Sequence, residues 1–162
     1  MKRRTIVQSA LCLLIACGRP HAQEASLQRL PDVHRVYVTP FAPGLGTDVI
    51  ASHLVAELKK TGRFEVVPSA EQADAFLSGT IQVSKVEHFA KAVADHVYGK
   101  ATYQARAHVQ LLGKNQQILW AEDASGDAPG PGGSNLARVS TSLAERIVKD
   151  LLKATAKEAK GH

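Results

Sequence analysis

The strongest constraint on the fold is an alternation of apolar and polar residues that runs over eleven positions, 101–111. Alanine, tyrosine, valine or leucine occupies every odd position. A period of two predicts a β-strand with one buried face and one polar face, which is typical of an antiparallel sheet with one side open to solvent. The polar face of this strand consists of Thr102, Gln104, Arg106, His108 and Gln110.

Runs of β-branched, aromatic and alternating apolar residues predict four further strands, at 35–39, 64–67, 75–86 and 117–124. Gly79 interrupts the third of these runs, and we expect there either a bulge or close packing against a helix. A turn at 113–115 leads into the last run, in which we expect Ile118 and Trp120 on one face of the strand.

Local signals predict two helices between these strands. Thr47 or Asp48 is expected to cap the first helix, and Gly62 is expected to stop it, because glycine readily takes the left-handed backbone of a helix end. A second, short helix begins at Ser69, since Ser69 and Gln72 have the spacing of a capping box.

A long C-terminal helix is predicted to start at Ser134 or Asn135. Its buried stripe recurs at helical spacing and consists of Leu136, Val139, Leu143, Ile147, Leu151 and Ala154. The predicted order of elements is therefore β-α-β-α-β-β-β-α. We expect an α/β (α+β) fold, with a mixed sheet of about five strands and the helices mainly on one face.

The first seventeen residues match a lipoprotein export signal. Residues 2–4 are cationic, and the apolar segment 5–16 is too short to span a bilayer, which needs about 20 residues. The sequence Leu14, Ile15, Ala16, Cys17 matches a lipobox, in which the cysteine becomes the acylated first residue of the mature protein. We therefore predict a signal peptide at 1–16 and lipidation of Cys17. Ordinary secretory cleavage after Ala22 is the alternative and would give a soluble secreted protein.

Loss of the signal changes both the charge and the cysteine count. The formal charge falls from +5 to +2, with 17 Lys and Arg against 15 Asp and Glu, so we expect no nucleic-acid partner. Cys12 leaves with the signal, and the single thiol of Cys17 cannot form an internal disulfide. Residues 17–32 lack sustained periodicity and contain two prolines, which predicts a flexible tether. A single α/β envelope domain follows at 33–159.

Four stretches resemble the bacterial envelope domains of the curli-secretion lipoprotein CsgG, the N-terminal domain of TolB and the penicillin-binding-protein activator LpoB. They are VYVTPF at 36–41, LKKTGRFEVV at 58–67, ADAFLSGTI at 73–81 and LWAE at 119–122. The resemblance implies a fold that serves protein–protein binding and envelope assembly rather than catalysis. The link 87–100 is too short for two membrane strands of about 9–11 residues each, so we expect no membrane pore.

The motifs of common catalytic and cofactor sites are incomplete in this sequence. Gly44 and Gly46 lie between a strand and a helix, but the third glycine of a dinucleotide loop is missing. The histidines of the mature chain are scattered without the close spacing of a zinc motif, which favours solvated or hydrogen-bonded roles. They include His53, His88, His96 and His108. We predict no cofactor, no metal and no catalytic residue.

The sequence thus predicts an exported protein of the periplasm or outer membrane that acts as a non-catalytic binding and assembly module. Its expected partners are other envelope proteins, together with the membrane through a lipid on Cys17. The candidate partner-binding face is the polar face of the 101–111 strand, and a merely solvated sheet face is the alternative. Two other functions stay open: a secreted enzyme such as a hydrolase, with a site near the Pro/Gly loop, and a ring-forming component of a secretion assembly.

Overall fold

The computed structural model describes residues 28–89, 99–127 and 135–161. In these ranges it contains five strands and two α-helices, which confirms the predicted fold class. The strands are β1 (Arg35–Val38), β2 (Glu65–Val66), β3 (Ala75–Phe89), β4 (Gly99–Gly113) and β5 (Ile118–Asp127). The helices are α1 (Thr47–Lys60) and α2 (Leu136–Lys160), with short 3₁₀ helices at η1 (Leu30–Asp32) and η2 (Ala70–Gln72).

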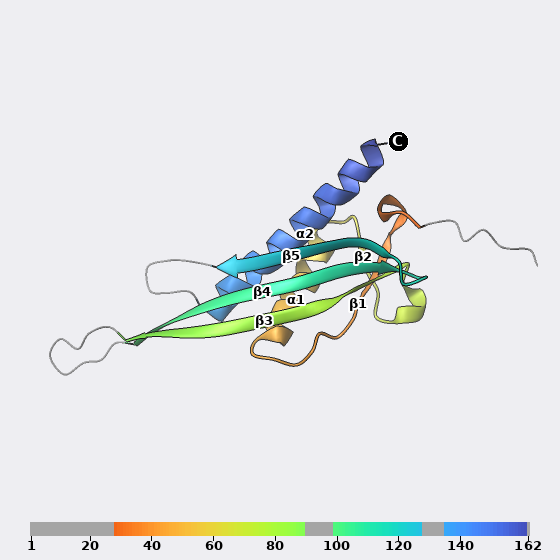
Figure 1. The fold of residues 1–162 in the computed structure, drawn as a ribbon. Helices are drawn as coiled ribbons and strands as arrows, with labels where there is room; N and C mark the ends of the chain where they lie inside the picture. The colour runs from red at the N-terminus through yellow and green to blue at the C-terminus, as the bar shows by residue number, and fades with distance from the viewer. Residues whose placement is uncertain (1–27, 90–98, 128–134, 162) are drawn as a thin grey trace, which may run out of the picture.

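The strands form one mixed sheet in the order β2-β1-β3-β4-β5. β1 runs parallel to both β2 and β3, whereas β3, β4 and β5 follow one another as antiparallel neighbours (Figure 1). The ladder between β3 and β4 is longer than the sequence predicted, because it continues to the pair Phe89 and Gly99. The predicted alternation on β4 is confirmed, since its described odd-numbered residues from Ala105 to Leu111 are buried.

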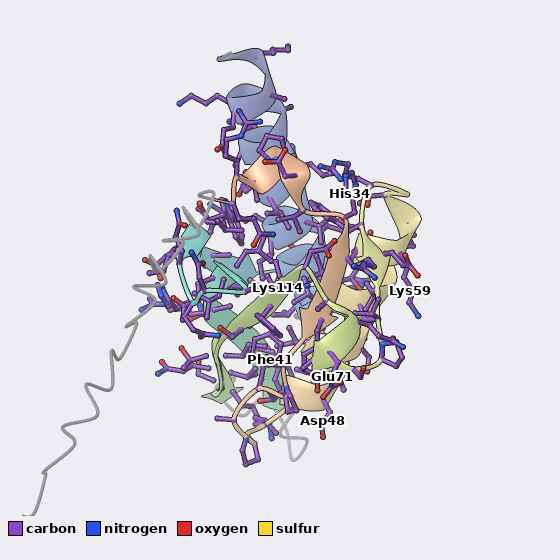
Figure 2. The ribbon with its side chains drawn as sticks, turned by 90° about the vertical axis from the view of Figure 1, so that its right-hand side faces the viewer. His34, Phe41, Asp48, Lys59, Glu71 and Lys114 are labelled. Atoms are coloured by element: carbon purple, nitrogen blue, oxygen red, sulfur yellow. The ribbon has the colours of Figure 1, made fainter. Side chains whose placement is uncertain are left out.

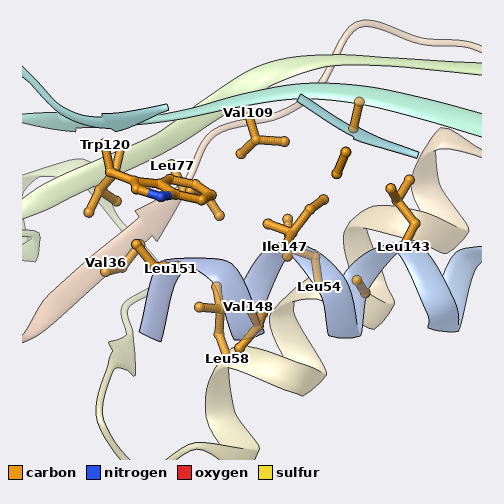
Figure 3. Close-up of a cluster of buried hydrophobic side chains, with 14 of the residues drawn as sticks. Val36, Leu54, Leu58, Leu77, Val109, Trp120, Leu143, Ile147, Val148 and Leu151 are labelled. Atoms are coloured by element: carbon orange, nitrogen blue, oxygen red, sulfur yellow. The ribbon is translucent and has the colours of Figure 1, made fainter. Parts of the chain in front are cut away.

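Both α-helices lie on the same side of the sheet, and the core fills the space between (Figures 1 and 3). The predicted stripe on α2 is buried at Val139, Leu143, Ile147 and Leu151, while Leu136 and Ala154 are partly exposed. A second stripe on α2 is also buried, at Ser140, Ala144 and Val148. The second stripe arises because α1 packs along α2, so α2 contacts the sheet and a helix at once.

Trp120 belongs to this core and is 9% exposed. It points from β5 toward the helices (Figure 3) and pairs in register with Leu111 of β4. Ile118 does not share its face, which corrects the sequence prediction, because the pairing with β4 shifts between Leu111 and Leu112. Leu111 faces Trp120, and Leu112 faces Ile118, so Leu119 is the extra residue of a β-bulge. Ile118 is consequently 59% exposed, on the other side of the sheet.

Gly79 marks close packing against a strand, rather than the bulge or helix contact that we expected. It pairs in regular register with Val109 on β4. A Cβ atom on Gly79 would lie 2.1 Å from the carbonyl oxygen of His108, a distance that no side chain can tolerate. Gly79 has a φ of +158°, and glycine at this position therefore lets the β3 backbone lie against the β4 backbone without a clash.

Two predicted helix starts also need correction. Helix α1 begins at Thr47, after Gly46 in the left-handed conformation, and no side chain caps it. The residues after Ser69 form the three-residue 3₁₀ helix η2, in which the Ser69 side chain makes no capping bond. The Glu71 carboxylate accepts hydrogen bonds from its own backbone N–H and from the Ser69 hydroxyl, and both lower its pKa. The Ser69 side chain thus bonds to Glu71, whereas the capping box had predicted Gln72 as the second member.

The segment just before β1 is docked on the domain, although the sequence predicted a flexible tether up to residue 32. Leu30 is 2% exposed and is part of the core, and η1 contacts α2. Arg63 holds the segment in place, since its guanidinium donates to the carbonyl oxygens of Pro31 (2.6 Å) and Val33 (2.8 Å). The domain therefore includes residues 28–32, whereas 17–27 lie outside the described residues.

Candidate functional site

One side of the sheet is covered by the two helices, and no described element covers the other side. We call this second side the open face. It carries the even-numbered side chains of β3 from Phe76 to Ser84, those of β4 from Thr102 to Leu112, and Ala121, Asp123 and Ser125 of β5. All five residues that the sequence assigned to the candidate binding face lie on it. Gln104, Arg106 and His108 are exposed, while Thr102 and Gln110 are partly exposed.

A hollow of about 350 Å³ lies in the middle of the open face. The sheet register builds it from two adjacent rows of three side chains, one from each of β3, β4 and β5. The first row is Gln82, Arg106 and Ser125, and the second is Thr80, His108 and Asp123. We call this site the polar hollow. It offers a guanidinium, an imidazole, a carboxylate, two hydroxyls and one amide.

One side-chain hydrogen bond crosses the polar hollow. Nδ1 of His108 lies 2.8 Å from Oδ1 of Asp123, and both side chains are exposed, at 52% and 87%. The Asp123 carboxylate is thereby directed to His108. Ser125 also lines the hollow, but among the described residues no hydrogen bond joins its hydroxyl to His108, so the three do not form a nucleophilic triad.

Arg106 is a cation of the hollow that is left without a partner among the described residues. Within that part of the chain, its guanidinium makes neither a hydrogen bond nor an ion pair. A guanidinium presents a planar fork of N–H donors that matches a carboxylate in a bidentate contact. The hollow can therefore accept one anionic group from outside the domain.

Sequence reasoning missed a second feature of the open face. The register places four large apolar side chains side by side across the sheet, and we call them the apolar row: Tyr37, Phe76, Leu112 and Ile118. The first three are partly exposed, and Ile118 is 59% exposed. None of the four belongs to the buried core. The sequence did contain a signal for this row. Phe76 and Leu112 are apolar at even positions, although the even positions of their strands form the polar face.

A second, larger hollow of about 890 Å³ lies at the end of the sheet that carries His34 and Lys114 (Figure 2). Several of its charged groups pair with one another. Arg35 donates to Asp74 at 2.9 Å, and Arg29 lies 3.3 Å from Asp32. The Gln28 side chain donates to the carbonyl oxygen of Asp74 and accepts from the backbone N–H of Lys114. This hollow is structural.

Asp74 is the centre of that network. Partial burial acts to raise the pKa of its carboxyl, but the Arg35 guanidinium and the backbone N–H groups of Arg35 and His34 donate to the carboxylate. The net effect is a pKa below the usual range. A charged Asp74 therefore fixes the start of β1 against β3.

Several positions that the sequence singled out lie outside the described residues. They are Cys17, His96 and the loop at 128–134, where the alternative enzyme site was expected, together with the side chain of His88. The ring of His53 lies 3.5 Å from the Thr141 hydroxyl, between α1 and α2. Among the described residues, no three His, Cys, Asp or Glu side chains gather closely enough to hold a metal ion. Neither described helix is long and apolar enough to cross a bilayer.

Comparisons with known proteins give similarity in structure alone. No protein-family model matches the sequence, and no curated protein matches it either. A PelC variant dodecamer from Paraburkholderia phytofirmans is similar with a TM-score of 0.49 and 16% identity, over 73% of this chain and 85% of that one. Uncharacterized lipoprotein B from Nitrosomonas europaea has a TM-score of 0.47 and 18% identity, over 82% and 90%. A minor lipoprotein from Acinetobacter baumannii has a TM-score of 0.42 and 7% identity, over 78% and 95%.

Bacterial lipoproteins are thus among the structures to which this chain is similar. At these scores and identities the similarity carries no argument about function. The resemblance to CsgG, TolB and LpoB stays a prediction.

Proposed function

We propose that this protein is an exported, lipid-anchored envelope protein whose open face binds another envelope protein without catalysis. The observation that carries the proposal is the open face itself, which has the apolar row, an arginine without a partner among the described residues, and no described element over it. A sheet face that only meets solvent is expected to be polar throughout. Contiguous exposed apolar side chains are a common mark of interaction sites.

The arrangement in the polar hollow favours binding over catalysis. An acid–base catalyst needs a positioned pair beside a nucleophile or an electrophilic centre. His108 and Asp123 are both largely exposed and bind each other, and Ser125 makes no bond to His108 within the described structure. We expect His108→Ala to leave envelope integrity at the wild-type level in a normally localised protein. Loss of function in a well-folded His108→Ala variant would bring the enzyme alternative forward.

Anchoring rests on the lipobox sequence that ends in Cys17. Growth with a clickable fatty acid should label the wild-type protein, and Cys17→Ser should abolish the label. A wild-type protein that stays unlabelled and whose mature N-terminus is Gln23 would contradict lipidation and indicate a soluble secreted protein.

Binding through the open face is tested with two matched substitutions. Ala121 is exposed on the open face, whereas Ala137 is exposed on α2. The tagged mature protein is recovered from chemically crosslinked envelopes with its bound proteins. We expect Ala121→Glu to lose a protein that both the wild type and Ala137→Glu retain. Equal recovery from all three would contradict the open face as the contact surface.

A further inference from the structure

The open face has an apolar end and a polar hollow at a fixed separation, and together they define what a partner must present. We infer that it docks a protein segment that sets apolar side chains on the apolar row and places an aspartate or glutamate carboxylate at Arg106. This inference rests on the proposed function and names the chemistry of its partner.

The apolar end consists of neighbouring side chains on four strands. Tyr37, Phe76 and Leu112 are partly exposed, and Ile118 extends the row to the edge strand β5. The bulge at Leu119 is what turns Ile118 toward this face, because a regular ladder would have placed it with Trp120. A sequence that only needed a stable core would gain nothing from exposing Ile118 there.

The polar end carries one cation, the Arg106 guanidinium, that has no anionic partner among the described residues. The Asp123 carboxylate is held by His108 at 2.8 Å, which leaves the Arg106 guanidinium without an anion among the described residues. Gln82 and Ser125 flank Arg106 in register and can donate to the same group. An incoming carboxylate would meet the guanidinium fork with polar donors on both sides.

The two ends are six residues apart on β4, from Leu112 to Arg106. At about 3.3–3.4 Å per residue this separation is about 20 Å. An extended partner segment of about six residues spans this distance, and so does a helix of about 13 residues. Between Leu112 and Arg106 lie two rows of small or polar side chains: Ser78, Gln110 and Ala121, and then Thr80, His108 and Asp123 of the polar hollow, where the Asp123 carboxylate is bonded to His108.

This combination favours a protein over a glycan or a membrane. Leu112 and Ile118 are aliphatic and match apolar side chains, and the interior of protein interfaces is enriched in Tyr, Phe and Arg. A membrane surface is bound by wide apolar faces flanked by several cations. Here the described open face pairs a narrow row with a single unpaired arginine, Arg106.

The test uses a photo-reactive benzoylphenylalanine at Ile118 or at Ser125 in the full chain, crosslinked in intact cells. Mass spectrometry then identifies the partner peptide joined at each position. Each reporter is combined with Arg106→Gln, with Arg106→Lys, or with Arg138→Gln as the matched control, because Arg138 is exposed on α2. Leu112→Ser tests the apolar end.

We expect both reporters to join one partner protein, with an Asp or Glu in the peptide at Ser125 and apolar residues in the peptide at Ile118. Arg106→Gln should lower the Ser125 adduct at least about ten-fold, Arg106→Lys should restore part of it, and Arg138→Gln should leave it unchanged. Leu112→Ser should lower the Ile118 adduct.

Other outcomes separate this inference from the proposed function. The inference would be overturned if the yield of the adduct with a partner protein were the same in Arg106→Gln as in the wild type, or if the crosslinked peptides lacked a carboxylate. The proposed binding role would remain intact in both cases. Adducts with a second copy of this chain, a glycan or a lipid would overturn the partner class. If neither reporter forms an adduct, and Ala121→Glu and the wild type recover the same bound proteins, both the inference and the proposed function are overturned.

Discussion

The missing Cβ of Gly79 would lie 2.1 Å from the carbonyl oxygen of His108, so the strand next to the polar hollow has room for glycine alone. Gly79→Ala must push β3 away from β4. We expect it to lower the free energy of unfolding by at least about 1–3 kcal/mol, as overpacking does. Urea denaturation followed by circular dichroism measures this change.

The matched control for Gly79→Ala is Gly161→Ala, because a Cβ on Gly161 would have no atom nearer than 3.7 Å. Its effect should stay within about 0.5 kcal/mol. Equal stability of Gly79→Ala and the wild type would mean that the two strands are not as close as described.

The core between α2 and the sheet should respond to truncation. Leu143 and Ile147 are fully buried against the sheet. Leu143→Ala or Ile147→Ala should each cost about 2–5 kcal/mol of unfolding free energy, because a cavity replaces the lost side chain. Thermal and urea unfolding measure the loss, and Glu145→Ala, on the exposed side of α2, should change stability by about 0.5 kcal/mol or less. A loss below that level at both core positions would contradict the packing of α2.

The parts of the fold that local patterns determine could be predicted from the sequence. Alternation over 101–111 placed Arg106 and His108 on the polar face of β4, and helical spacing placed Leu143 and Ile147 in the core. These periodicities reflect which side of one element is buried, so they need no knowledge of its neighbours.

The features that were missed depend on contacts between distant residues. The bulge that exposes Ile118 is set by pairing with Leu112. Ala144 is buried because α1 packs on α2, and Leu30 is buried although its segment has no periodic pattern. The Arg106–Ser125 and His108–Asp123 neighbours became visible only with the register of β5.

Asp74 should make the stability depend on acid pH. Its pKa is lower in the folded protein than the usual value of about 3.9 in an unfolded chain. The stability that it contributes is therefore fully present above the unfolded pKa and is lost as pH falls through the folded pKa. Asp74→Asn should be less stable than the wild type at pH 7, and the difference should shrink as the pH is lowered below about 4.

Urea unfolding at a series of pH values measures this dependence. Asp123→Asn is the control, because the Asp123 side chain is 87% exposed and its loss should cost little stability. A stability difference between Asp74→Asn and the wild type that is the same at every pH would show that the charge of Asp74 is not the cause.

Arg63 should be the clamp on the segment that precedes β1. Its guanidinium reaches the carbonyl oxygens of Pro31 and Val33 and lies 5.1 Å from the centre of the Phe64 ring. We expect Arg63→Gln to release this segment while the sheet stays folded. Amide hydrogen exchange at Val33 should then become about ten-fold faster or more, because local opening costs less free energy.

Arg29→Gln is the control for the clamp, since Arg29 pairs with Asp32 at the exposed surface. Val33 should keep its wild-type exchange rate in that variant. Unchanged exchange of Val33 in Arg63→Gln would contradict the clamp.

The central claim is that the open face is covered by a partner in the envelope, and thiol labelling tests it most directly. Ser125 is exposed on the open face and Ser52 is exposed on α1. Since the proposed lipid blocks Cys17, a cysteine at either position is the one thiol expected to react. We predict that a maleimide labels Ser125→Cys several-fold more slowly in isolated envelopes than in the purified protein, while Ser52→Cys reacts at the same rate in both. Equal rates for Ser125→Cys in the two preparations would contradict the claim.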